Sequence, residues 1–349
     1  MQLQMIPSTQ QTFGSAIKTM FSVSRSVARG VWALLLVAAL LVVPGGCGAA
    51  TTDAPDDGKI SIVCTVAMIG DVVKEVAGDK AHVVTLLGPG TDPHGYKPTR
   101  DDIVAMQNAD VIFYAGLHLE GKMTDVLAKL GQQKPVYALA EVIDKTKLLD
   151  RDGAHDPHVW MDATLWAQVV REAGRRLSER DPTHAADYTR RADELAARCE
   201  ALFVYGQQVM KTIPPQSRLL VTSHDAFNYF GRAYGIDVTG VQGISTESEA
   251  NIKDINRLVD TLVSRNVKAV FVESSVAPKN VQAIVEGAKS RGHDVNVGGE
   301  LFSDAMGAGG TYEGTYIGMI DHNITIVVNA LGGQAPTQGW QGKLSTKSK

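Results

Sequence analysis

The chain shows one order of predicted elements in two places, and this repeat limits the folds open to it. Residues 59–114 and 219–272 each have the pattern strand, helix, strand, loop, helix, strand, judged from β-branched runs and from apolar residues at helical spacing. Strands that alternate with helices predict parallel sheets with helices on both faces. We therefore expect an α/β fold of two lobes, 59–181 and 214–333. The predicted strands are 59–65, 82–87, 111–114, 219–222, 238–242 and 269–272, and the predicted helices include 70–77, 227–234 and 252–263.

A long helical segment joins the two predicted lobes. Apolar residues recur at helical steps from Pro182 to Ile213, Asp181 is a candidate N-cap, and Pro214 ends the segment. A helix of about thirty residues rises about 45 Å, which is enough to run along both lobes and tie them together. The alternative is two shorter helices broken near Gly206, because glycine weakens a helix interior.

The N-terminal residues have the features of a secretion signal rather than of a folded element. An uninterrupted apolar run, Val31–Val43, follows a basic region. The run is too short to span a bilayer comfortably. We predict a signal peptide over 1–46, with Met20 as a second candidate for the true start. An uncleaved anchor helix is the alternative.

Both ends of the chain carry short polar segments outside the predicted lobes. Pro44-Gly45-Gly46-Cys47 resembles the lipobox of bacterial lipoproteins, although those motifs usually have an aliphatic residue where this chain has Pro44. We predict lipidation of Cys47 and a polar tether over 47–58, which would hold the folded part at a membrane surface. Residues 334–349 are predicted to form a polar tail.

The two remaining cysteines do not form a metal-binding pair. Cys64 lies in a strand-like run and Cys199 in a helical one, and neither belongs to a Cys-x-x-Cys motif. A disulfide bond between them is the alternative, because an exported protein meets oxidising conditions. We favour two buried free thiols that act as small hydrophobic side chains.

The charge balance excludes one class of partner. The chain has 349 residues, 44% of them hydrophobic and 21% charged, which is ordinary for a globular protein of about two domains. Its net charge is −4, and no basic block offers a footprint for nucleic acid. We therefore expect no binding to DNA or RNA.

Four short motifs carry side chains that bind metal ions. Asp92-Pro93-His94 returns as Asp156-Pro157-His158, and Ser223-His224-Asp225 and Phe302-Ser303-Asp304 follow. Together they offer three imidazoles and a carboxylate, which suit a divalent transition ion. The proline of each Asp-Pro-His motif confines the backbone, so less entropy is lost on binding. His94 and His224 each follow a predicted strand, which is where ligands bind in open parallel sheets.

The motifs resemble those of the TroA-like, or zinc-uptake-protein-A, family of ABC-transporter solute-binding proteins for zinc, manganese or iron. The resemblance covers residues 59–331 and includes the long helical segment. The matching motifs, in the order of the family, are Asp-Pro-His-Gly-Tyr-Lys-Pro-Thr at Asp92, Gly-Leu-His-Leu-Glu at Gly116, Asp-Pro-His-Val-Trp at Asp156, Thr-Ser-His-Asp-Ala-Phe at Thr222, Gly-Ile-Ser-Thr-Glu at Gly243 and Glu-Leu-Phe-Ser-Asp at Glu300.

This resemblance implies a metal site in the cleft between the lobes. His94 and His158 would be the ligands from the N-terminal lobe, and His224 and Asp304 those from the C-terminal lobe. Many manganese and iron members have glutamate at the position of His224. His224 therefore gives this chain a nitrogen ligand where those members have an oxygen ligand. Zinc members commonly carry a histidine-rich loop before the second ligand, where this chain offers His155.

The resemblance also implies a function in transport. The chain would capture Zn²⁺ or Mn²⁺, or less favourably Fe²⁺, and deliver it to an ABC permease and its ATPase. We expect an exported, lipid-anchored monomer in the periplasm or at the cell surface, and no enzymatic activity. The alternatives are a surface adhesin and a metal-dependent hydrolase, although the hydrolase lacks a His-Glu-x-x-His spacing.

Other polar residues have less specific assignments. Asp225 is predicted either to orient His224 or a neighbouring ligand, a support that metal-bound imidazoles need, or to cap a local turn. His155 could replace His158, but its motif match is poorer. Satisfied or solvated side chains are expected for His118, His184, His293 and His322, and carboxylates near the cleft for Glu247, Glu249 and Glu273.

Overall fold

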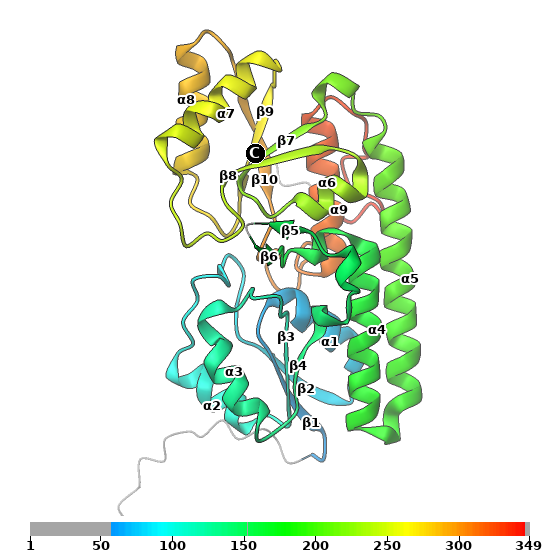
Figure 1. The fold of residues 1–349 in the computed structure, drawn as a ribbon. Helices are drawn as coiled ribbons and strands as arrows, with labels where there is room; N and C mark the ends of the chain where they lie inside the picture. The colour runs from blue at the N-terminus through cyan, green and yellow to red at the C-terminus, as the bar shows by residue number, and fades with distance from the viewer. Residues whose placement is uncertain (1–56, 152, 346–349) are drawn as a thin grey trace, which may run out of the picture. The chain divides into compact units, whose positions relative to one another are not determined.

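The computed structural model describes residues 57–151 and 153–345, which belong to one compact unit (Figure 1). The predicted signal peptide, the lipidation site Cys47 and all but the last two residues of the predicted tether fall on residues 1–56, outside the described part. Within the described residues, no helix combines the length and apolarity that crossing a membrane requires.

The N-terminal lobe is built on a parallel sheet with the strand order β2-β1-β3-β4. Its helices, α1, α2 and α3, connect successive strands. Thr99 begins α2 with a capping box, in which its hydroxyl accepts the Asp102 N–H and the Asp102 carboxylate accepts the Thr99 N–H. The strands are β1 (Ile60–Cys64), β2 (Ala81–Thr85), β3 (Val111–Tyr114) and β4 (Val136–Ala138), and the helices are α1 (Ala67–Ala77), α2 (Arg100–Asn108) and α3 (Thr124–Gly131).

The C-terminal lobe repeats this arrangement with two parallel strand pairs, β7 with β8 and β9 with β10. Because β7 packs beside β9, the spatial order β8-β7-β9-β10 corresponds to that of the first lobe. The prediction of two related α/β lobes is confirmed. The elements are β7 (Leu219–His224), α6 (Asn228–Tyr234), β8 (Asp237–Gln242), α7 (Ile252–Ser264), β9 (Ala269–Glu273), α8 (Lys279–Ser290), β10 (Asn296–Leu301) and α9 (Tyr316–Ala330).

Some predicted boundaries are wrong by a few residues. Helix α1 starts at Ala67 rather than at Gly70, because its N-cap, Val66, offers no side-chain hydrogen bond that would mark the start in the sequence. Strand β7 runs two residues further than predicted, so His224 is its last residue instead of following it. Short elements fill the connections: η1 (Gly121–Met123), η2 (Leu139–Val142), η3 (Lys145–Lys147), β5 (Asp150–Arg151), β6 (Ala154–His155), η4 (Val159–Met161), η5 (Pro182–His184) and η6 (Pro215–Ser217).

Helix α5 (Ala185–Met210) runs along both lobes, and α4 (Ala163–Arg180) packs antiparallel against it beside the N-terminal lobe (Figure 1). Helix α5 has 26 residues and rises about 39 Å. It contacts α1 of one lobe and α6 and α9 of the other. The helix is continuous through Gly206, so the alternative of two broken helices is wrong. Pro182 lies in a separate turn before it.

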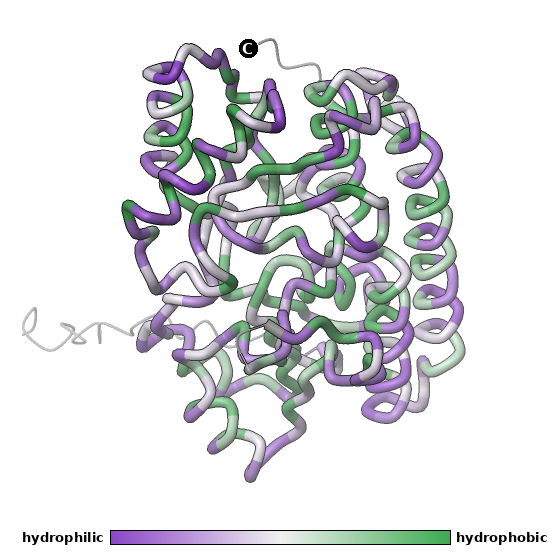
Figure 2. Tube along the Cα trace, turned by 45° about the horizontal axis from the view of Figure 1, so that its top comes forward, coloured by the Kyte–Doolittle hydropathy of each residue, from purple (hydrophilic) through white to green (hydrophobic). Residues whose placement is uncertain are grey.

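A glycine lets the two long helices approach closely. A β-carbon added at Gly174 of α4 would lie 2.6 Å from the Ala192 β-carbon of α5 and 3.2 Å from the Tyr188 carbonyl oxygen. Both helices are amphipathic, and hydrophilic and hydrophobic residues alternate along them (Figure 2). The small residues at this contact therefore set the distance between α4 and α5.

One hydrophobic core connects the two lobes on the side of the long helices. It includes Trp166 of α4, Leu202 of α5, Phe271 of β9 and Tyr316 of α9, all buried. A second, smaller core lies between α7, α8 and the sheet of the C-terminal lobe. Burial of each large side chain contributes about 1.5–3 kcal/mol, so this packing stabilises the lobes as a pair.

The two thiols lie within the larger core. Cys64 and Cys199 are free and buried, as favoured from the sequence. Most of residues 334–345 are exposed, but the Trp340 ring stacks on Tyr205 of α5 and Leu344 is buried. Asp321 fixes this segment by accepting the Trp340 N–H.

Gly174→Ala is expected to destabilise the protein by about 1–3 kcal/mol, because the added methyl group overpacks the contact between α4 and α5. Gly131→Ala is the matched control. That site, at the exposed end of α3, has 3.8 Å to its nearest neighbour, so alanine should stabilise by about 0.5–1 kcal/mol. Urea unfolding measures both free energies. Equal effects of the two substitutions would contradict the close approach.

Candidate metal centre

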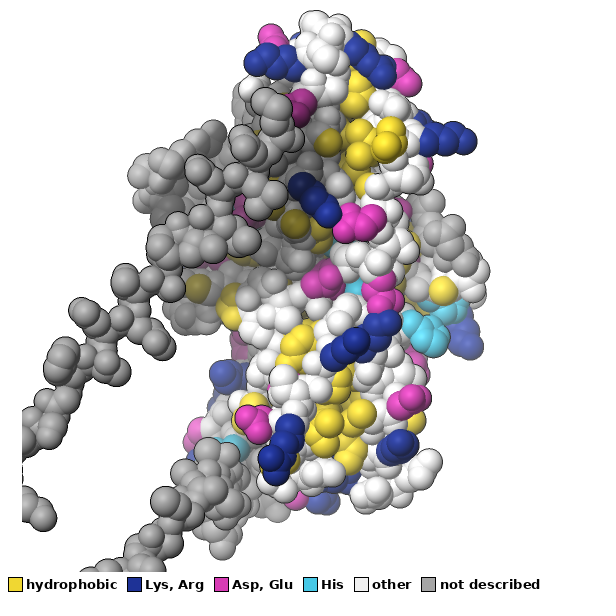
Figure 3. All heavy atoms as spheres, turned by 90° about the vertical axis from the view of Figure 1, so that its left-hand side faces the viewer, with side chains coloured by type: hydrophobic (Ala, Val, Ile, Leu, Met, Phe, Trp, Pro, Cys, Tyr) yellow, Lys and Arg dark blue, Asp and Glu magenta, His cyan; other side chains and the backbone are white. Residues whose placement is uncertain are grey.

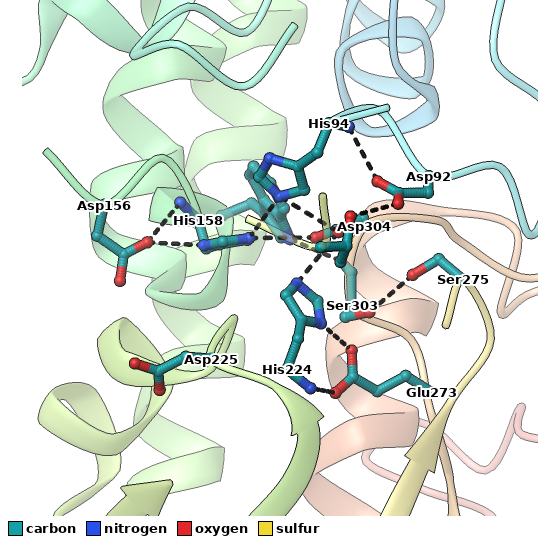
Figure 4. A network of polar contacts seen from close by, with 12 residues as sticks. Asp92, His94, Asp156, His158, His224, Asp225, Glu273, Ser275, Ser303 and Asp304 are labelled. Carbon is teal, nitrogen blue, oxygen red and sulfur yellow. Dashed lines mark hydrogen bonds and ion pairs between the residues drawn. The ribbon is translucent and has the colours of Figure 1, made fainter. Parts of the chain in front are cut away.

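His94 lies in the loop between β2 and α2, and its aspartate neighbour fixes the backbone there. Asp92 Oδ1 accepts a hydrogen bond from the His94 N–H at 2.9 Å. The other carboxylate oxygen of Asp92 accepts a hydrogen bond from the Thr246 hydroxyl, which belongs to the other lobe. The His94 side chain is 5% exposed, and Nε2 points toward the other imidazoles (Figure 4).

His158 lies just before η4, and its aspartate neighbour holds both backbone and ring. Asp156 Oδ1 accepts the His158 N–H at 3.0 Å and lies 2.7 Å from Nδ1 of the ring. The carboxylate therefore favours a proton on Nδ1 and leaves Nε2 as the donor for a metal. Asn228 and Tyr229 of α6 bind the Asp156 carboxylate and carbonyl at 3.1 and 2.9 Å.

His224 ends β7, and a carboxylate from the neighbouring strand holds it. Glu273, the last residue of β9, accepts the His224 N–H at 2.8 Å, and its other oxygen lies 2.5 Å from Nδ1. Gly240 on β8 allows this strand end to pack closely, because a β-carbon there would lie 2.4 Å from the His224 carbonyl carbon. Nε2 of His224 is again directed to the centre of the site (Figure 4).

Glu273 fills the role that the sequence suggested for Asp225. Both residues are acidic and close to His224, but Glu273 makes the contacts with its backbone and ring. The Asp225 carboxylate points away from the imidazole cluster (Figure 4). The Asp225 N–H donates to the Gly243 carbonyl, and the Asp225 carbonyl accepts a hydrogen bond from the Asn228 side chain. A supporting role of Asp225 therefore stays a prediction.

Asp304 follows β10 and brings the carboxylate to the three imidazoles. The two preceding residues are fixed by hydrogen bonds to side chains far away in sequence. Asn323 of α9 binds the N–H and carbonyl of Phe302 at 2.9 and 2.7 Å, and Trp160 Nε1 donates to the Ser303 carbonyl at 2.9 Å. Asp304 is 2% exposed, and among the described residues neither carboxylate oxygen has a hydrogen-bond partner of good geometry.

The four predicted ligands meet at the spacing of a tetrahedral site. Asp304 oxygens lie 3.6 Å from Nε2 of His94, 3.3 Å from that of His158 and 3.2 Å from that of His224. Nε2 atoms of His94 and His158 are 3.3 Å apart, and all four donor atoms lie within 4.8 Å of one another. Zinc–nitrogen bonds of about 2.0–2.1 Å place tetrahedral donors about 3.3–3.4 Å apart. The donor set therefore fits one transition-metal ion.

Carboxylates control the charge of two imidazoles in this site. Burial disfavours a charged ring, but Asp156 and Asp304 outweigh it and raise the pKa of His158 to about 9. Against the same burial, Glu273 and Asp304 raise the pKa of His224 well above its usual value. Both shifts favour the protonated ring near pH 7, so a metal bound at Nε2 would have to displace these protons.

The pKa values of the other two predicted ligands, His94 and Asp304, are lowered. Burial lowers the pKa of His94, which is therefore neutral near pH 7 and ready to bind. Burial alone would raise the pKa of Asp304, but His224 and His158 hold it well below its usual range. A single ionised carboxylate thus faces every imidazole of the cluster.

The remaining histidines and glutamates lie outside this cluster. His118 is exposed, with a φ of 65°. Glu247 pairs with Lys122 and Glu249 with Lys279. The partners of the other histidines are Asp57 for His82, Asp150 for His155, Asp181 for His184, the Val267 carbonyl for His293 and the Glu300 carbonyl for His322.

Sequence reasoning missed the role of Glu273. Its signal was available, because Glu273 ends the buried run Ala269–Glu273 as His224 ends the run from Leu219. The ends of adjacent parallel strands meet at one sheet edge. What the sequence did not show was that β7 and β9 are neighbours.

A two-lobed α/β fold with a buried donor cluster between the lobes defines a solute-binding protein. The sequence model described as "Zinc-uptake complex component A periplasmic" matches residues 62–330. The chain belongs to this family, as the motifs suggested.

Two curated relatives match most of the chain. Manganese-binding lipoprotein MntA of Bacillus subtilis is 44% identical over 305 residues, which are 87% of this chain and 99% of that protein. Zinc-binding protein TroA of Treponema pallidum is 44% identical over 280 residues, 80% of this chain and 91% of that protein. The solved structure of periplasmic TroA from the same organism aligns with a TM-score of 0.77 and covers 78% of this chain and 99% of that one.

Glu273→Gln is expected to weaken metal binding about 10–100-fold, because the amide keeps a hydrogen bond to His224 but loses the charge that supports its ring. Glu249→Gln, which changes an exposed ion pair with Lys279, is the matched control and should bind as the native protein does. Competition with a chelating dye measures both affinities. If Glu273→Gln binds metal as tightly as the native chain does, Glu273 does not support His224 in metal binding.

Proposed function

We propose that the chain captures one divalent transition-metal ion and delivers it to the permease of an ABC importer. The observation that carries this proposal is the tetrahedral spacing of four buried donor atoms from His94, His158, His224 and Asp304. The names of its relatives, one manganese-binding and one zinc-binding, support the class of cargo. The ATPase that powers the importer would be a second partner, reached through the permease.

The donor set supports capture more than catalysis. Catalytic zinc sites usually have three protein ligands and keep one position for water. Here four buried residues offer donor atoms that lie within 4.8 Å of one another. Four protein ligands are one more than such catalytic sites usually have, so we propose a binding protein without enzymatic activity. Neither the hydrolase nor the adhesin alternative gains an observation in its favour.

Zinc and manganese are the proposed cargoes, with iron less favoured. Three imidazoles and one carboxylate bind zinc more tightly than manganese in solution, since affinity follows the general order of the divalent ions. The two relatives carry different metals at the same 44% identity, so similarity does not separate the two ions. The supply of each metal in the cell therefore also contributes to which ion the chain carries.

The chain outside the lobes fits an exported lipoprotein. We propose a signal peptide over 1–46, a lipid on Cys47 and a tether over 47–58 that holds a monomer at the membrane. The folded part would comprise the lobes 59–181 and 214–333 and the joining segment 182–213. The description of MntA as a lipoprotein supports this arrangement.

Protein that begins at Gly48 is expected to bind about one equivalent of zinc or manganese, because the donors form one four-ligand site. His224→Ala should weaken binding roughly a hundredfold or more. His184→Ala is the control, because that ring binds Asp181 away from the cluster. Calorimetric titration measures stoichiometry and affinity. Tight binding by His224→Ala would overturn the proposed site.

Metal affinity should rise with pH up to about 9, because zinc must displace the protons of His158 and His224, whose pKa values are raised. Asp304 stays ionised over this range, since its pKa is lowered. The affinity is therefore lowest at the acidic end. Titrations from pH 6 to 9, in buffers with different heats of ionisation, measure affinity and proton release. A flat profile without proton release would contradict this charge assignment.

A further inference from the structure

The segment that carries His158 is bound to the C-terminal lobe. Tyr229 OH of α6 donates to the Asp156 carbonyl and accepts the Leu149 N–H, both at 2.9 Å. Arg232 of the same helix donates to the Lys147 carbonyl at 2.7 Å. These bonds join residues 147–156, which come from the first lobe in sequence, to a helix of the second.

Buried bonds at the centre of the molecule continue this attachment. Trp160 Nε1 donates to the Ser303 carbonyl, next to the ligand Asp304. Tyr316 OH of α9 donates to the Trp160 carbonyl at 2.8 Å. Trp160 and Tyr316 are fully buried. His158 is thus fixed to the body that carries His224 and Asp304, although its place in the sequence is in the N-terminal lobe.

His94 has a different attachment. Its loop meets the C-terminal lobe through the hydrogen bond between Asp92 and Thr246, two half-buried side chains. Beside it, Lys122 and Glu247 form an ion pair at 2.5 Å with 42% and 45% of their side chains exposed. Charged side chains of both signs lie close together where the lobes meet on this face (Figure 3). His94 is also the most exposed of the four ligands.

We propose that Thr246 is a positioning residue for His94, and that the ion leaves when the loop 88–99 separates from Thr246. His158, His224 and Asp304 stay together as a three-donor site while His94 opens and closes the fourth position. This inference rests on the proposed metal capture.

The geometry of Asp92 explains how Thr246 acts on a ligand that it does not touch. One carboxylate oxygen holds the His94 N–H and the other holds the Thr246 hydroxyl. A hydrogen bond to a charged group is stronger than a neutral one, so this contact fixes the loop more firmly than its exposure suggests. The exposed pair of Lys122 and Glu247 contributes less, because solvent screens it.

The test compares metal release from three variants of the protein that begins at Gly48, which contains all the described residues. Thr246→Val removes the hydroxyl and keeps the branched shape, whereas Thr246→Ser keeps the hydroxyl and removes the methyl group. Thr261→Val is the matched control, because that exposed hydroxyl bonds within its own helix, to the Arg257 carbonyl. Zinc-loaded protein is mixed with excess chelator, and the dissociation rate is followed in stopped flow.

We expect Thr246→Val to release zinc about tenfold faster, with little change in the association rate, and Thr246→Ser and Thr261→Val to behave as the native chain. An unchanged release rate in Thr246→Val overturns the proposal, as does equal acceleration in Thr261→Val. Failure of the native chain to bind zinc would instead refute the proposed function. The two failures are therefore separate.

Amide hydrogen exchange gives an independent measurement on the native chain. Removal of zinc should speed exchange in residues 88–99 and leave residues 149–162 protected, because only the first segment is proposed to open. Thr246→Val should show the same faster exchange in 88–99 while zinc is bound. Equal loss of protection in both segments would show that His158 moves with His94, and would overturn the inference.

Discussion

The interaction on which the site depends is the close approach of one buried carboxylate to three imidazoles. Asp304 lies within 3.6 Å of all three Nε2 atoms and has no competing hydrogen bond of good geometry among the described residues. A buried charge without compensation is costly. The surrounding structure places three imidazoles around Asp304, and in the proposed function a metal ion would compensate its charge. Each lobe contributes because neither one holds all four donors.

The two Asp-Pro-His motifs share a backbone conformation but not a role. In both, the aspartate accepts the N–H of the histidine two residues on. Asp156 Oδ1 also bonds the ring of His158, whereas Asp92 makes no such contact with the ring of His94. The second carboxylate oxygen of both residues contacts the C-terminal lobe, through Asn228 for Asp156 and through Thr246 for Asp92. The two contacts differ in burial, because Asp156 and Asn228 are buried whereas Asp92 and Thr246 are half-buried.

Much of this arrangement could be predicted locally. Parallel strands, their approximate bounds, the helix that ties the lobes and the four donor residues all follow from periodicity, proline positions and motif resemblance. The errors arise where local signals are silent. Helix α1 begins without a capping side chain, so its start was placed three residues too late. Glu273 was left among unspecific carboxylates because its partner lies 49 residues away in sequence.

The sequence alone determined the fold class and the family and predicted the four candidate donors, because each of these depends on short-range pattern and residue chemistry. Only the tertiary structure decided which carboxylate supports which imidazole, since Glu273 reaches His224 through the packing of β7 beside β9. It also decided that His158 is attached to the C-terminal lobe through Tyr229 and Trp160. Such contacts join residues far apart in the chain, and their distances are set by the packing of whole elements rather than by any local preference.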